Sequence, residues 1–109
     1  MKNSFDERNL KEINSWLKAN KKIALATVIH TWGSSPQPIG SRMIINENGE
    51  FSGSVSGGCI ESSVIRECLE IMKKNKPFKK IDFNISNENA WEVELACGGE
   101  ISIFIEQIN

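Results

Sequence analysis

Apolar residues recur along this chain with two different periods, one typical of helices and the other of strands. Residues 4–20 begin with the spacing of a capping box, Ser-x-x-Glu, and then place apolar side chains three and four positions apart. Helical spacing returns after a Gly-Gly-Cys sequence and stops before a lysine-rich stretch and a proline. We therefore predict two helices. Their apolar stripes contain Leu10, Ile13, Trp16 and Leu17 in the first, and Ile60, Val64, Cys68 and Met72 in the second.

Five other stretches have the character of strands. Residues 23–31 form a continuous run rich in β-branched side chains, the pattern of a strand covered on both faces. Residues 42–46 and 51–55 flank an Asn-Gly pair, the short-range signal of a β-hairpin. Residues 78–85 and 100–108 alternate apolar and polar positions. Together these elements predict a mixed α/β (α+β) domain, in which a single mixed sheet of about five strands packs with two helices.

Length and composition agree with one domain over residues 1–109. Of the 109 residues, 39% are hydrophobic and 25% are charged, which is an ordinary globular composition. A net charge of −1 provides no general attraction to nucleic acid. No apolar run approaches the roughly 20 residues needed to cross a bilayer, so we expect no membrane partner. Three cysteines and no secretory signal at the N-terminus favour a cytoplasmic protein with reduced thiols.

Two cysteines stand beside pairs of glycines. Gly57-Gly58-Cys59 places a thiol in the first turn of the predicted second helix, where the positive helix end lowers a thiol pKa and free amides can bind an anion. Cys97-Gly98-Gly99 precedes the last strand, and glycine in such a place often marks close approach by a ligand. From the residues alone, each cysteine is also explained as a small buried side chain beside a tight turn. If the two turns converge, they frame one pocket.

Other candidates have stronger structural explanations. The Gly33-Ser34-Ser35-Pro36 loop offers hydroxyls and amides suited to an anion, although serine-rich loops are mostly only loops. Glu61, in the first turn of the second helix, is best explained by its favourable interaction with the helix dipole. The alternative is an acid–base or cofactor-binding role. His30, at the end of a strand, is either a ligand or a hydrogen-bonded structural histidine. We expect Cys68, on an apolar stripe, to be a core residue.

Three groups of residues, in this order, resemble the N-terminal domain of the XdhC/CoxI family, also called xanthine dehydrogenase accessory factors. The resemblance extends over nearly the whole chain. The groups are Gly33-Ser34-Ser35-Pro36 with Gly40-Ser41-Arg42-Met43, then Gly53-Ser54-Val55-Ser56-Gly57-Gly58-Cys59-Ile60-Glu61, and then Cys97-Gly98-Gly99.

This resemblance implies an accessory protein for the maturation of molybdenum hydroxylases such as xanthine dehydrogenase. Such proteins bind the molybdenum cofactor (molybdopterin), hold it while a sulfido ligand is installed with a cysteine desulfurase, and pass it to the apo-enzyme. Cys59 and Cys97 would be the thiols near the metal, with Cys59 next to molybdenum, because soft thiolates suit such a site. The residues implied at the cofactor are Gly33, Ser34, Ser35, Arg42, Ser56, Gly57, Gly58, Cys59, Glu61, Cys97, Gly98 and Gly99.

Two features depart from the family pattern. Gln37 stands where we expect a basic residue after the Ser-Ser-Pro sequence, which weakens phosphate binding by that loop. Family members usually continue into a Rossmann-like C-terminal domain, whereas this chain stops. We expect either that a separate Rossmann-domain subunit is a partner or that this chain does only part of the family's task. An unoccupied sheet edge would also favour a homodimer.

The leading hypothesis is therefore a cofactor-binding chaperone rather than an enzyme with turnover of its own. One alternative is a thiol redox or sulfur-carrier protein that uses Cys59 as nucleophile and Cys97 as resolving thiol. Another is a non-catalytic interaction subunit, in which the glycines are structural and the acidic C-terminal segment docks a partner.

Overall fold

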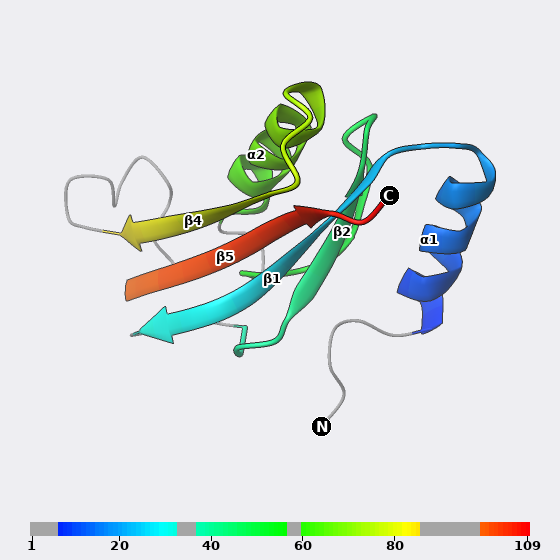
Figure 1. Cartoon of the computed structure of the whole chain (residues 1–109). Helices are drawn as coiled ribbons and strands as arrows, with labels where there is room; N and C mark the ends of the chain where they lie inside the picture. The colour runs from blue at the N-terminus through cyan, green and yellow to red at the C-terminus, as the bar shows by residue number, and fades with distance from the viewer. Residues whose placement is uncertain (1–6, 33–36, 57–59, 86–98) are drawn as a thin grey trace.

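A computed structural model describes residues 7–32, 37–56, 60–85 and 99–109 of the chain (Figure 1). The predicted class is confirmed, because two helices pack with one five-stranded sheet. The described helices include none that is long and apolar enough to span a membrane. The elements are α1 (Glu7–Lys18), β1 (Ile23–Trp32), β2 (Arg42–Asn46), β3 (Phe51–Gly53), α2 (Glu61–Lys73), β4 (Phe78–Ile85) and β5 (Gly99–Gln107).

The strands lie in the order β3-β2-β1-β5-β4, and each neighbouring pair is antiparallel, so the described sheet is antiparallel and not mixed as predicted. The last strand, β5, therefore lies between β1 and β4. Ala26, near the middle of β1, pairs with Met43 of β2 on one side and Ile105 of β5 on the other. The β2–β3 hairpin forms at the predicted Asn-Gly pair, where Gly49 has a φ of 84° and its amide donates to the Asn46 carbonyl.

Helix α2 covers one face of the sheet and encloses the main core. Its predicted apolar stripe is confirmed, since all four of the residues are buried. They pack against side chains of the central strands β1 and β5. Because alternate residues of a strand point to the same face, each of these strands contributes a row of apolar side chains to the core. The buried members from the helix stripe and the two central strands are Ile60, Val64, Cys68, Met72, Ala24, Ala26, Val28, Ile101, Ile103 and Ile105.

Helix α1 lies against the opposite face, and only over one end of the sheet. Its Trp16 is buried with Ile23 of β1 and Ile44 of β2 in a small second cluster. Leu10 and Leu17 were predicted to share the buried stripe, but they are 52% and 42% exposed. That prediction was wrong because the helix contacts the sheet through a narrow line around Trp16.

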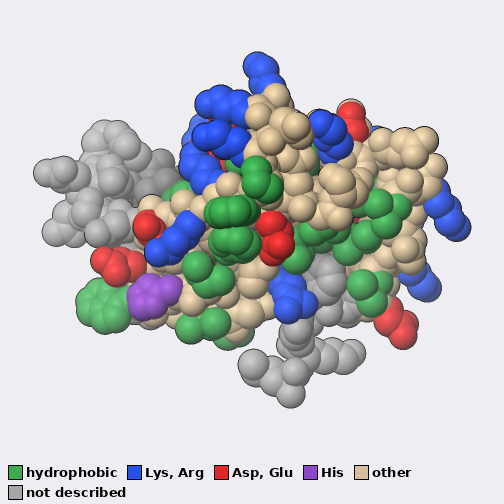
Figure 2. Space-filling view, viewed as in Figure 1, with side chains coloured by type: hydrophobic (Ala, Val, Ile, Leu, Met, Phe, Trp, Pro, Cys, Tyr) green, Lys and Arg blue, Asp and Glu red, His purple; other side chains and the backbone are tan. Residues whose placement is uncertain are grey.

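The limited reach of α1 also corrects the prediction for β1, which is covered on both faces only near its start. Toward its end, after a register shift between Val28 and His30, Ile29 is 42% and Trp32 is 68% exposed. We call the part of the sheet surface opposite α2 and beyond α1 the open face. Figure 2 shows hydrophobic side chains interspersed with acidic and basic ones on this side of the molecule. By strand register, the open face carries Thr27, His30, Trp32, Arg42, Phe78, Lys80, Asp82, Glu100, Ser102 and Phe104.

Candidate functional site

Three strand ends meet at one end of the sheet, next to candidate sequences for cofactor binding. Trp32, the last residue of β1, pairs with Glu100 near the start of β5. Ile85, the last residue of β4, pairs with Gly99, the first residue of β5. Trp32 directly precedes the Gly-Ser-Ser-Pro sequence, and Gly99 directly follows Cys97-Gly98. These two flanking residues therefore lie at the same end of the sheet.

The start of α2 faces this same end. At the other end, the side chain of Gln107, the last residue of β5, donates to the carbonyls of Ile71 (3.2 Å) and Lys76 (2.6 Å), close to where α2 ends. Since α2 runs antiparallel to the following strand β4, its first residue, Glu61, lies toward the end where β5 begins (Figure 1). The start of α2 thus points toward the three strand ends, while Ser54 of the Glu61 cluster lies beside Arg42, which pairs with Thr27 in the middle of β1.

Glu61 is the centre of a buried hydrogen-bond cluster at the start of α2. The side chain is only 8% exposed. Its Oε2 accepts hydrogen bonds from the Ser54 hydroxyl (2.8 Å), the Val55 amide (3.0 Å) and the Ser56 amide (2.9 Å). Its Oε1 accepts a further bond from the Ser56 hydroxyl. The carboxylate therefore holds three consecutive residues that precede the Gly-Gly-Cys sequence.

Ser56 completes the link to the helix. Its hydroxyl donates to Glu61 and accepts a hydrogen bond from the amide of Ile60, at 2.9 Å. One side chain therefore connects the residue before Gly57-Gly58-Cys59 with the residue after it. The sequence had singled out Ser56 and Glu61, but not Ser54, whose hydroxyl is separated from Glu61 by seven positions along the chain.

These contacts keep Glu61 ionised. Burial raises the pKa of this carboxyl, but the hydrogen bonds from Ser56, Ser54 and Val55 outweigh burial and lower the pKa from 4.5 to about 2. A charged carboxylate enclosed by donors of its own chain satisfies those donors, which would otherwise be buried without partners. This contact gives Glu61 a structural role in addition to the two considered from the sequence, the helix dipole and a cofactor ligand.

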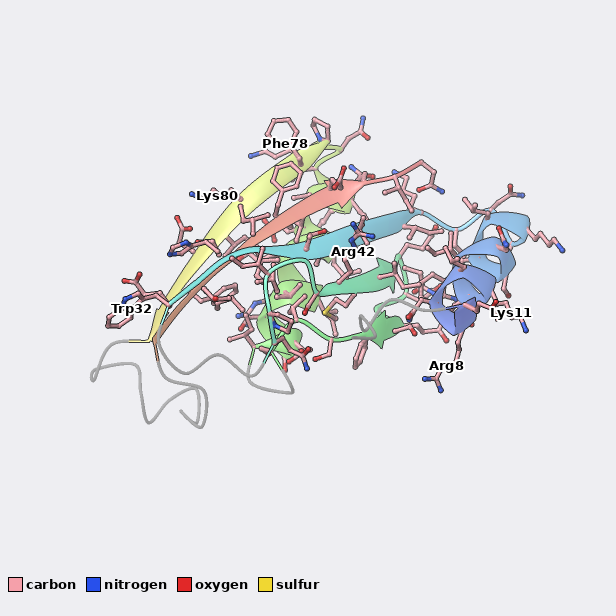
Figure 3. The ribbon with its side chains drawn as sticks, turned by 90° about the horizontal axis from the view of Figure 1, so that it is seen from below. Arg8, Lys11, Trp32, Arg42, Phe78 and Lys80 are labelled. Carbon is pink, nitrogen blue, oxygen red and sulfur yellow. The ribbon has the colours of Figure 1, made fainter. Side chains whose placement is uncertain are left out.

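The structure does not bring the Arg42 side chain to Glu61. Arg42 pairs with Thr27 and therefore shares the open face, whereas the Glu61 cluster lies on the α2 side of the sheet. Figure 3 shows Arg42 in front of the sheet, with α2 behind it. Only the Arg42 backbone approaches the cluster, because its carbonyl accepts a hydrogen bond from the Ser54 amide at 3.2 Å.

Comparison with known proteins identifies the family. Residues 16–83 match the XdhC and CoxI family. The chain belongs to this family. It is 29% identical over 93 residues to the molybdenum cofactor insertion chaperone PaoD of Escherichia coli, a match that covers 84% of this chain and 28% of PaoD. It is also 24% identical over 98 residues to a probable xanthine dehydrogenase subunit of Bacillus subtilis, covering 88% of this chain and 29% of that protein.

A solved structure shares the fold of this XdhC and CoxI family chain. The crystal structure of a xanthine dehydrogenase from Bacillus halodurans superposes with a TM-score of 0.73 at 23% sequence identity. The match covers 93% of this chain and 30% of that one. The present chain therefore spans less than a third of the length of each of these three proteins.

The remaining predicted residues of this family member divide into three groups. Gly99 opens β5, and its position beside Ile85 places it at the sheet end described above. The side chains of Cys68 and His30 have separate environments: Cys68 is a core residue, as predicted, and burial raises its thiol pKa to about 12, while His30 is exposed on the open face. Outside the described residues lie Gly33, Ser34, Ser35, Gly57, Gly58, Cys59, Cys97 and Gly98.

No cluster of three or more histidine, cysteine or acidic side chains suited to a metal ion occurs among the residues that the structure describes. The described part of the candidate site therefore consists of the Glu61 cluster, the start of α2 and the three strand ends. The candidate thiols are attached to this frame: Cys59 directly precedes Ile60, and Cys97 is two positions before Gly99.

Proposed function

We propose that this chain is an accessory protein of molybdenum hydroxylases such as xanthine dehydrogenase, and that it binds the molybdenum cofactor at the end of the sheet where β5 begins. Membership of the XdhC and CoxI family and the names of PaoD and the Bacillus subtilis relative support this role. One structural observation carries the location. The chain enters β5 beside the end of β4, at the end of the sheet toward which the start of α2 points (Figure 1).

The start of α2 fits the anionic part of such a cofactor. Ile60, the N-cap residue, makes no side-chain cap hydrogen bond, so the amides of Ser62 and Ser63 in the first turn would serve a phosphate group. Glu61 would not compete for this group as a ligand, because its carboxylate is bound to Ser54, Val55 and Ser56. When bound, the cofactor supplies a molybdenum atom on a dithiolene, to which soft thiolate side chains are well matched.

In this proposal Cys59 is the thiol next to molybdenum and Cys97 is the second thiol. The glycines beside them allow the pterin to approach the backbone, because a glycine has no side chain in the way. Glu61 keeps Ser56 and Ile60 in place and does not touch the cofactor. Arg42, on the open face, is also outside this set. The residues proposed at the cofactor are Gly33, Ser34, Ser35, Ser56, Gly57, Gly58, Cys59, Cys97, Gly98 and Gly99.

The proposed partners follow from the same role. The apo-form of a molybdenum hydroxylase receives the cofactor, and a cysteine desulfurase supplies the sulfur for the terminal sulfido ligand. The relatives are more than three times as long as the region that matches. All of these steps take place in the cytoplasm, where thiols stay reduced.

The proposal is tested by mixing the purified chain with molybdenum cofactor and separating it on a sizing column. Fluorescent pterin should elute with the wild-type chain and should be lost with the double variant Cys59→Ser/Cys97→Ser. The matched control is Cys68→Ala, which removes the third, buried thiol and should retain the pterin. Absence of pterin from the wild-type fraction, or equal retention by the double variant, would overturn the proposal. In that case a thiol pKa of Cys59 well below about 8.5 would favour the thiol redox or sulfur-carrier alternative.

A further inference from the structure

The strand β4 forms one edge of the sheet. Its eight residues, Phe78–Ile85, pair with β5 in one unbroken register. The strand at the other edge, β3, has only three residues. In the parts of the chain that the structure describes, no strand pairs with the outer side of β4. A long, regular edge strand presents a row of backbone donors and acceptors that another strand can bind.

The charges that usually protect such an edge are compensated within the chain. Lysines on an edge strand discourage pairing by repulsion. Here the Lys79 ammonium lies 2.7 Å from the Glu67 carboxylate of α2, and the Lys80 ammonium lies 3.6 Å from the Asp82 carboxylate of β4 itself. On the open face of β4, the positive charge of Lys80 and the negative charge of Asp82 are therefore neighbours.

We propose that β4 is a homodimer interface, at which a second copy of this chain adds its own β4 in antiparallel orientation. The two copies are related by a two-fold axis through the position of Ile81. The pairing joins the two five-stranded sheets into one continuous sheet. Because the paired strands run in opposite directions, the candidate cofactor sites of the two copies lie at opposite ends of this sheet.

The charge pattern selects Ile81 as the centre. In a two-fold antiparallel pair of identical strands, one residue must face its own copy. If that residue is Lys80 or Asp82, two like charges stand directly opposite each other, which is unfavourable. With Ile81 at the centre, each Lys80 faces Asp82 of the second copy, and this attractive pair occurs twice. This register also matches Phe78 with position 84, so nearly the whole length of β4 is used.

The test measures the mass of the purified chain by light scattering on a sizing column over a range of concentrations. We expect twice 12.2 kDa for the wild-type chain. Lys80→Asp and Asp82→Lys each replace two attractive pairs by two repulsive ones, so each should raise the dimer dissociation constant roughly tenfold or more. The double variant Lys80→Asp/Asp82→Lys restores the complementarity and should return the mass to that of the dimer.

The control is Lys11→Asp, which makes the same change of charge on the exposed surface of α1 and should leave the dimer intact. Since Lys80 and Asp82 are exposed, circular dichroism should show unchanged folding in every variant. A mass of 12.2 kDa for the wild-type chain at all concentrations would overturn the proposal. So would a dimer that both single variants leave unchanged, because such a dimer uses another surface.

Discussion

Glu61 and Ser56 are joined by two hydrogen bonds, although the Gly57-Gly58-Cys59 sequence separates them along the chain. The Ser56 amide donates to Oε2 of Glu61 at 2.9 Å, and the Ser56 hydroxyl donates to Oε1. The same hydroxyl accepts from the Ile60 amide at 2.9 Å. The two flanks of Gly57-Gly58-Cys59 are thus fixed to each other by Ser56, Ile60 and Glu61.

The first prediction concerns the contribution of this contact to stability. Glu61→Gln keeps the shape of the side chain but replaces one charged acceptor oxygen by a donor group, which faces the donors of Ser54, Val55 and Ser56. Hydrogen bonds to a charged group are worth more than neutral ones, so the free energy of unfolding should fall by about 2 kcal/mol. Urea denaturation measures the change. The control is Glu12→Gln on the exposed side of α1, and an equal effect of both substitutions would contradict the prediction.

The second prediction concerns acid. The pKa of Glu61 is about 2 in the folded chain and 4.5 when unperturbed. A carboxyl whose pKa is lowered by folding stabilises the folded state above its unfolded pKa, and this contribution disappears as the pH falls through the folded pKa. The free energy of unfolding should therefore decrease between pH 4.5 and about 2, and it should decrease less steeply in Glu61→Gln. Urea titrations at several pH values measure both slopes, and identical slopes would show that another group is responsible.

Much of the fold could be predicted from the sequence because the periods are local. The stripe of α2 repeats every three to four residues, and each of its predicted residues lies in the core. The coverage of β1 could not be predicted in the same way. A continuous apolar run shows that side chains on both faces are hydrophobic, but the reach of α1 over the second face depends on packing. Ile29 is apolar and yet 42% exposed for this reason.

The candidate site was predictable only in part. Glu61 and Ser56 stood out through their place beside a glycine-rich turn, and the structure brings them together. Arg42 was grouped with them, although it lies on the other face of the sheet. Strand alternation normally reveals such a difference. In β2 the four residues after Arg42 are all buried, because α2 covers one face there and α1 the other, so the alternation is hidden.

The third prediction concerns the thiol of Cys68. This side chain is fully buried, and burial, with a contribution from the charge of Glu67, raises its pKa to about 12. Alkylating reagents attack the thiolate, so Cys68 should not react in the folded chain at about pH 8 and should react readily in urea. Mass spectrometry of the peptide that contains residue 68 measures the modified fraction under each condition. Equal rates in buffer and in urea would contradict the buried position.

The last prediction compares two glycines that have nearly the same backbone conformation and different surroundings. Gly53 and Gly40 have φ angles of 91° and 95°, which side chains rarely adopt, so alanine at either position costs about 1–2 kcal/mol of backbone strain. A Cβ at Gly53 would also lie 2.5 Å from the Arg42 carbonyl oxygen and 3.0 Å from the Met43 Cα, whereas one at Gly40 meets nothing within 4 Å. The backbone of β2 would have to move away from β3, next to the residues that Glu61 holds.

Gly53→Ala should therefore lower the free energy of unfolding by about 3 kcal/mol or more, and Gly40→Ala by only about half as much. Urea denaturation of the two variants measures both changes in the free energy of unfolding. Because the backbone strain is common to both variants, equal decreases would show that β2 and β3 are not as close at Gly53 as the structure places them.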